Sequence, residues 1–146
     1  MVIIFTTKKE DNNEESNNSI KRNKKIIFKA PEAIWPYSKA YRINWLVFCS
    51  WQIALNPDTM ELVEGWIEEQ TRQVCRNIAW VLAEYNLSLK NVIKTTVYLK
   101  NMSDFNKMNN IYKDYFILKP ARSTVEVSNL PKNALIEIEV IAKTNS

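Results

Sequence analysis

The sequence predicts an α+β fold in which one mixed β-sheet carries two helices on one face. Three observations indicate this class: segments rich in β-branched and aromatic residues, two segments whose apolar residues recur at three- and four-residue spacing, and a final stretch that alternates apolar and polar residues. The chain has 146 residues, 46% of them hydrophobic, which suits one domain with a substantial core.

The first half of the chain predicts two strands and a helix. KKIIFKAPEAI, stopped by Pro31, is the first expected strand, and YRINWLVFCSWQI is the second. LNPDTMEL follows as a loop. From Ile67 the period changes to that of an amphipathic helix ending near Asn86, because one face carries Ile67, Thr71, Val74, Cys75, Ile78, Leu82 and Tyr85.

The second half predicts a strand, a helix and two more strands. NVIKTTVYLK is the strand, and Ser103 is the expected N-cap of a helix closed by Pro120. That helix should turn Phe105, Met108, Tyr112 and Tyr115 or Phe116 inward. KPARSTVEVSNLPKNALIEIEVIAK then indicates two strands joined by a turn, since its last part alternates with a period of two.

Four charged residues interrupt this last pair of strands: Arg122, Glu126, Glu137 and Glu139. They mark either a solvated sheet face or the polar lining of a site. The two helices cover one face of the sheet, and the other still carries Val, Ile and Phe. We therefore expect a closed symmetric oligomer to cover that second face.

The start of the chain differs in composition from the rest. KKEDNNEESNN is polar and predicts disorder, so we expect an N-terminal extension over residues 1–24 and one domain over residues 25–146. The apolar run Met1–Phe5 is too short for a signal peptide, and nothing indicates a membrane segment. These features predict a cytoplasmic protein.

Histidine is absent from the whole chain. This excludes Ser-His-Asp and Cys-His nucleophiles and removes the commonest metal ligand. Cys49 and Cys75 have no metal-site spacing and are expected to be free buried thiols, so no metal site is predicted. Proton transfer near neutral pH would have to use carboxylates, backbone groups, Tyr, Lys or the substrate itself.

The net charge of +4 raises the question of nucleic-acid binding. A local cluster accounts for much of the positive charge: Lys21, Arg22, Lys24, Lys25 and Lys29. A solvated basic tail is the favoured interpretation, and an RNA-binding arm is the alternative.

Five ordered blocks carry a resemblance to a known family: APEAIWPYSKA, LVFCSWQIALNPDTMELVEG, IEEQTRQVCRNIAWVL, VIKTTVYLKNMSDFNKMNNIY and PARSTVEVSNLPKNALIEIEVIA. Together they resemble the Rid family of reactive-intermediate deaminases, also described as the L-PSP endoribonuclease or translation-inhibitor family. The resemblance extends from about Lys25 to Ala142. It implies a chorismate-mutase-like fold and a homotrimer with an active site in each cleft between subunits.

The resemblance also implies a chemistry that needs no cofactor: hydrolysis of 2-enamine and 2-imine acids, such as 2-aminoacrylate, to 2-keto acids and ammonia. By family position, Arg122 would bind the substrate carboxylate and Glu137 would orient or activate the attacking water. The remaining cleft would be lined by Tyr37, Ser50, Trp51, Asn109 and Thr124. A guanidinium suits a carboxylate independently, since it donates two parallel hydrogen bonds.

Two tryptophans depart from the family pattern, because Trp35 and Trp51 stand where the family has glycine. The chain holds one glycine, whereas average usage of about 7% would give roughly ten. Glycine often marks positive φ or close backbone approach, so we expect Trp51 to border the substrate and weaken activity. Trp35 is expected to act mainly on stability.

Two other functions stay open beside the deaminase. One is an RNA-directed endoribonuclease or translation inhibitor, although the chain has no histidine for acid–base cleavage. The other is a non-catalytic trimer that binds small carboxylates.

Overall fold

The structure is a computed structural model and describes residues 29–144. The predicted disordered extension and most of the first predicted strand lie outside the described residues. Three short 3₁₀ turns, Leu89–Asn91, Met102–Asp104 and Pro131–Asn133, join some of the main elements. The main elements are β1 (Ala40–Ile43), β2 (Leu46–Gln52), α1 (Ile67–Ala83), β3 (Val92–Leu99), α2 (Phe105–Tyr115), β4 (Ala121–Glu126) and β5 (Ile136–Lys143).

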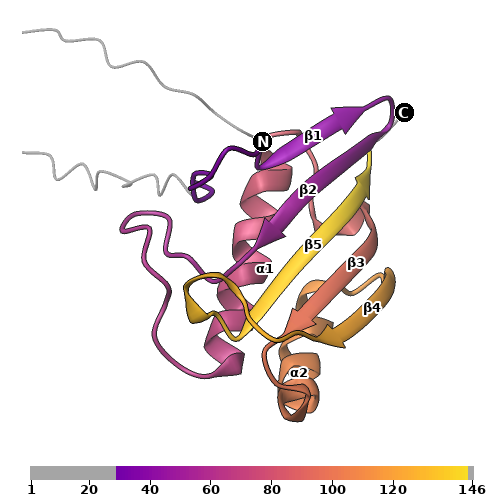
Figure 1. Cartoon of the computed structure of the whole chain (residues 1–146). Helices are drawn as coiled ribbons and strands as arrows, with labels where there is room; N and C mark the ends of the chain where they lie inside the picture. Colours follow the sequence, from indigo (N-terminus) through magenta and orange to yellow (C-terminus); the bar gives the residue numbers. More distant parts are fainter. Residues whose placement is uncertain (1–28, 145–146) are drawn as a thin grey trace, which may run out of the picture.

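The strands form a five-stranded mixed sheet in the order β1-β2-β5-β3-β4. Both helices lie on the same face of this sheet, and β1 and β4 form its two edges (Figure 1). The predicted α+β class, with one sheet and two helices on one face, is confirmed.

The final stretch is not the expected pair of adjacent strands. Strand β3 lies between β4 and β5, and it pairs in parallel with β4 and antiparallel with β5. Parallel strands need a crossover, and α2 provides it between β3 and β4. The alternation of apolar and polar residues reported the faces of β5 correctly, but a period of two does not identify a strand's partner.

The second expected strand is in fact a hairpin. Its register pairs Ile43 with Leu46, so a two-residue turn at Asn44 and Trp45 separates β1 from β2. Asn44 has a φ of 51°, a left-handed conformation that asparagine tolerates better than most residues. The expected strand before it is also wrong over its described part, since residues 29–34 contain no strand.

The helices follow the predicted faces, with one correction at a cap. In α1 the predicted inward residues are buried, except that Tyr85 is half-buried beyond the helix end. Asn86 has a φ of 59° in the turn after Ala83, as its residue type allows. Ser103 is not the N-cap: the Asn101 side chain accepts the Ser103 N–H at 2.9 Å and begins the 3₁₀ turn leading into α2.

The core lies between the helices and one face of the sheet. Val97, Ile136 and Ile138 from the sheet and Ile78 and Leu82 from α1 are fully buried. Replacing one of these large residues with alanine should cost about 2–5 kcal/mol of stability. Both cysteines are free and buried as predicted, and burial raises the pKa of Cys49 to about 12.

The other face of the sheet carries both polar and apolar side chains. On β3, residues 95, 97 and 99 point toward the helices, so residues 94, 96 and 98 face the opposite side. Exposed side chains on that side include Tyr41, which is 68% exposed, and Phe48. This uncovered side is called the open face below.

Candidate functional site

Arg122 is held by three side chains of α2. Its position on β4 pairs with the buried Thr95, so it points to the helix side of the sheet. Arg122 Nη1 donates a hydrogen bond to Asn109 Oδ1 at 2.7 Å. Its guanidinium carbon lies 4.7 Å from the ring centre of Tyr112 and 5.6 Å from that of Phe105. These contacts fix the guanidinium while leaving other N–H groups to bind an anion.

Tyr112 provides the support beneath Arg122. Its hydroxyl lies 2.7 Å from Thr95 Oγ1, and its ring is buried. Burial raises the pKa of Tyr112, so its hydroxyl stays neutral at physiological pH. The sequence pattern assigned this residue to the core only. The signal that could have found it is its place three residues after Asn109, which puts both on one helix face.

Thr124 lies on the same side of β4 as Arg122, two residues further along. Its Oγ1 is buried and has no hydrogen-bond partner among the described residues. A buried hydroxyl without a partner is costly, so this oxygen marks a place where a ligand or a second chain could supply one. Asn109, Tyr112, Arg122 and Thr124 are called the arginine half-site.

Glu137 lies on the open face, where it pairs with Tyr98 of β3. It is only 8% exposed, and no described residue gives its carboxylate a hydrogen bond or ion pair. Burial, together with the nearby charge of Glu139, raises the pKa of Glu137 to about 7. A carboxyl group with such a pKa can both accept and return a proton near neutral pH.

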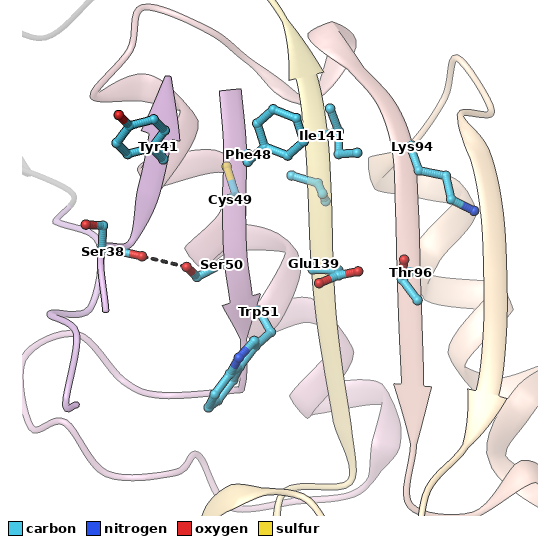
Figure 2. Close-up of a pocket in the computed structure, with 11 residues that line it drawn as sticks. Ser38, Tyr41, Phe48, Cys49, Ser50, Trp51, Lys94, Thr96, Glu139 and Ile141 are labelled. Atoms are coloured by element: carbon cyan, nitrogen blue, oxygen red, sulfur yellow. Dashed lines mark hydrogen bonds between the residues drawn. The ribbon is translucent and has the colours of Figure 1, made fainter. Parts of the chain in front are cut away.

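Tyr37 lies close enough to Glu137 to respond to its charge. Burial, and to a lesser extent the Glu137 charge, raises the pKa of Tyr37, so the phenol is a neutral donor. Ser50 is held by its own hydrogen bond, in which Oγ donates to the Ser38 carbonyl at 2.5 Å (Figure 2). This contact ties the segment before β1 to β2.

Trp51 occupies a β-bulge. Cys49 pairs with Val140 and Gln52 with Ile138, so Ser50 and Trp51 together lie opposite Glu139. The Trp51 ring stacks on Tyr37, with centroids 5.5 Å apart, and contacts Trp35 at 5.9 Å. Tyr37, Ser50, Trp51 and Glu137 are called the glutamate half-site.

The two tryptophans do not strain the backbone in the way their glycine positions suggested. Neither Trp35 nor Trp51 is among the described residues with positive φ. Trp51 lies with Glu137 on the open face, and the arginine half-site is on the other side of β4. Within one chain, the Trp51 indole therefore packs on aromatic neighbours instead of covering Arg122.

The structure thus brings the predicted site residues together in two groups. Glu137 faces the open side, whereas Arg122 and Thr124 face the helix side at the edge strand. One chain therefore does not place Arg122 and Glu137 around a common cavity. The open face has a hollow of about 680 Å³ beside the glutamate half-site, lined in part by Ser50, Trp51 and Glu139 (Figure 2).

Residues 29–144 also bear on metal binding and on membrane insertion. Within that range no three His, Cys, Asp or Glu side chains gather in a way that could hold a metal ion. No helix described there has the length and apolar character needed to cross a bilayer.

Comparison with known proteins agrees with the fold. The Endoribonuclease L-PSP family model matches residues 27–144. A RutC family protein of Pyrococcus abyssi is 51% identical over 122 residues, covering 82% of this chain and 96% of that protein. Reactive Intermediate Deaminase A, chloroplastic, of Arabidopsis thaliana is 43% identical over 125 residues, covering 85% of this chain and 67% of that protein.

The fold is also similar to that of a solved structure. The crystal structure of E. coli TdcF with bound serine has a TM-score of 0.76 and 35% sequence identity, covering 80% of this chain and 94% of that one. The sheet order, the two helices on one face and these likenesses define a small α+β protein of the L-PSP and Rid type. The chain belongs to the Endoribonuclease L-PSP family, and the predicted family is confirmed. Because the Arabidopsis relative is chloroplastic, the cytoplasmic location stays a prediction.

Proposed function

We propose that the protein hydrolyses reactive 2-imino and 2-enamino acids to 2-keto acids and ammonia. The observation that carries this proposal is the pair of half-sites: a supported guanidinium suited to a carboxylate, and a desolvated carboxyl group whose pKa lies near 7. The Arabidopsis relative, whose name is that of a reactive-intermediate deaminase, supports the same class of reaction.

In this proposal Arg122 binds the substrate carboxylate through two parallel hydrogen bonds. Asn109 takes one guanidinium N–H and the Tyr112 ring supports its face, so the remaining N–H groups are aligned before substrate arrives. The unpartnered Thr124 hydroxyl lies on the same side of β4 and would bond to a substrate oxygen.

Glu137 acts on water. As a carboxylate it takes a proton from the water whose oxygen bonds to C2 of the protonated imine, and the C=N π electrons move onto the nitrogen. The protonated Glu137 then returns its proton to the amine nitrogen of the tetrahedral intermediate. The C2–N bond breaks, ammonia leaves, and the C2 hydroxyl gives its proton to the Glu137 carboxylate, which yields the keto acid. Glu137 then releases that proton to solvent. An enamine such as 2-aminoacrylate first takes a proton from solvent on its terminal carbon to become the protonated imine.

Because the half-sites face different ways, the proposal needs more than one chain. We propose a homotrimer in which the arginine half-site of one copy meets the glutamate half-site of the next. Repeating such a head-to-tail contact around a threefold axis closes the ring. The exposed side chains of Tyr41 and Phe48 on the open face would then be buried.

The test is keto-acid release from 2-aminoacrylate supplied by a dehydratase, measured with and without the protein. We expect a clear acceleration by the parent and a loss of about a hundredfold in kcat/KM for Arg122→Lys. Lysine keeps the positive charge but cannot donate two parallel hydrogen bonds to a carboxylate. Arg76→Lys, at an exposed position of α1, is the matched control and should match the parent.

Two outcomes would reject the proposed deaminase activity. No acceleration by the parent, with saturable binding of small 2-keto acids, would favour the non-catalytic carboxylate binder. No acceleration, with cleavage of RNA by the same preparation, would favour the RNA-directed alternative suggested by the family's name.

A further inference from the structure

Three aromatic rings lie in contact beside Glu137, with Trp51 stacked on Tyr37 and tilted against Trp35. Trp51 lies in the middle: its ring is 5.5 Å from Tyr37 at an angle of 29°, and 5.9 Å from Trp35 at an angle of 47°. Trp35 and Trp51 are sixteen positions apart in sequence, so the bend at Pro36 and the bulge of β2 bring them together. Trp35, Tyr37 and Trp51 are called the aromatic stack.

The stack is fixed from behind. Trp51 packs against a small apolar cluster that includes Ile53, Leu130 and Ala134. Tyr37 is half-buried, and its backbone N–H donates to the Trp35 carbonyl at 2.7 Å. The rings are therefore held in place before a ligand arrives, which lowers the entropic cost of binding one.

Within one chain, the front of the stack is uncovered. Trp35 is 48% exposed, and Trp51 also lines the hollow on the open face together with Ser50 and Glu139. Tyr37 connects these rings to the reaction, since its phenol lies within the electrostatic influence of Glu137. A group attached to the reacting carbon would thus lie near the rings while water is activated at Glu137.

We propose that the aromatic stack binds the substrate's side chain and makes the site select 2-imino acids with a flat, aromatic side chain over 2-aminoacrylate and 2-iminopropanoate. This inference rests on the proposed deaminase function. Flat rings pack on indole with large contact area and favourable edge and face geometry. A methyl or methylene group has too little surface to use the stack, and the Glu137 and Glu139 carboxylates disfavour acidic side chains.

The experiment compares two imines made in place by an amino acid oxidase, one from phenylalanine and one from alanine, with catalase present. Imine hydrolysis above the spontaneous rate gives kcat/KM for each. We expect the parent to favour the aromatic imine by at least tenfold. Trp35→Ala and Trp51→Ala should each lower that preference at least fivefold, mainly through KM for the aromatic imine.

Trp66→Ala is the matched control, because Trp66 is 77% exposed at the start of α1 and has no ring contact with the stack. It should keep the parental preference. The double variant Trp35→Ala/Trp51→Ala should lose little more than Trp51→Ala alone, since Trp35 depends on Trp51 for its place in the stack. A parent that prefers the small imine, or a preference unchanged in both single variants, would overturn the proposal.

A parent that hydrolyses neither imine would reject the proposed function but would still decide this inference. In that case tryptophan fluorescence is titrated with phenylpyruvate and with pyruvate. Tighter binding of phenylpyruvate that Trp35→Ala abolishes would support the aromatic stack as the side-chain site. Equal affinities for the two keto acids would reject it.

Discussion

The arginine and glutamate half-sites carry opposite charges, and they differ in whether neighbouring side chains stabilise the charge. Arg122 is satisfied in its surroundings, because Asn109 accepts one N–H and two rings lie against its guanidinium. A hydrogen bond to a charged group contributes about 1.5–3 kcal/mol, and a cation–π contact about 0.5–2 kcal/mol. Glu137 has none of these partners, and burial pushes it toward its neutral form. One half-site is organised to hold a charge, and the other to exchange a proton.

The largest expected effect tests the proton-exchange side of this comparison. Glu137→Gln should lower kcat/KM by about a hundredfold or more, since general acid–base catalysis contributes 10²–10⁴. The base is the ionised form, so parental kcat/KM should rise as pH increases through about 7 and then level off. A pH–rate profile of parent and variant checks both statements.

Glu139→Gln is the matched control for that profile. Glu139 is two residues along the same strand, and its charge raises the pKa of Glu137. Removing that charge should keep most activity but move the rise in kcat/KM to lower pH. A Glu137→Gln variant with parental turnover and an unchanged pH profile would show that another group activates water.

Part of the fold could be predicted from the sequence. The periods of 2 and 3.6 identify buried faces, so the α+β class and the inward residues of α1 followed from them. They contain no information on partners, and β3 therefore separated two strands that looked like a hairpin. The alternation of apolar and polar residues identified Arg122 and Glu137 as polar positions of their strands. Which side of the sheet each one faces is set by its pairing, Arg122 with Thr95 and Glu137 with Tyr98.

Side-chain contacts across the fold were also beyond sequence reasoning. The contact between Arg122 and Asn109 links a strand to a helix, and its distance depends on how α2 crosses the sheet. The contact between Trp35 and Trp51 depends on a β-bulge that no residue pattern predicted. Neither tryptophan has positive φ, so the backbone there accepts an ordinary L-residue conformation, and the expected effects of Trp51 on activity and of Trp35 on stability stay predictions.

A mixing experiment tests the proposal that the two half-sites meet between copies. Arg122→Lys and Glu137→Gln should each be nearly inactive alone. In randomly mixed trimers, about one quarter of the interfaces would join an intact arginine half-site to an intact glutamate half-site. We therefore expect co-refolding of equal amounts to recover about a quarter of parental activity.

Refolding each variant separately before mixing is the control, since subunits that do not exchange cannot form intact sites. Recovery in the co-refolded sample alone would support a shared site. No recovery in co-refolded material, with trimers confirmed by sedimentation, would mean that each chain builds its own site.

The smallest expected effect concerns stability and the glutamate half-site alone. The folded-state pKa of Glu137 is about 7, above its usual value of 4.5, so the folded protein binds a proton more tightly than the unfolded chain. The stability cost of ionising Glu137 is therefore absent below about pH 4.5, grows as pH rises, and is complete above about pH 7. Glu137→Gln removes this cost and should raise the free energy of unfolding by about 1–3 kcal/mol at pH 8 but little at pH 5. Denaturant titrations of parent and variant at both pH values, with Glu139→Gln alongside, measure the difference. An equal effect at pH 5 and pH 8 would show that folding does not raise the pKa of Glu137. The contrast between an arginine with hydrogen-bond partners and a glutamate without them would then fail.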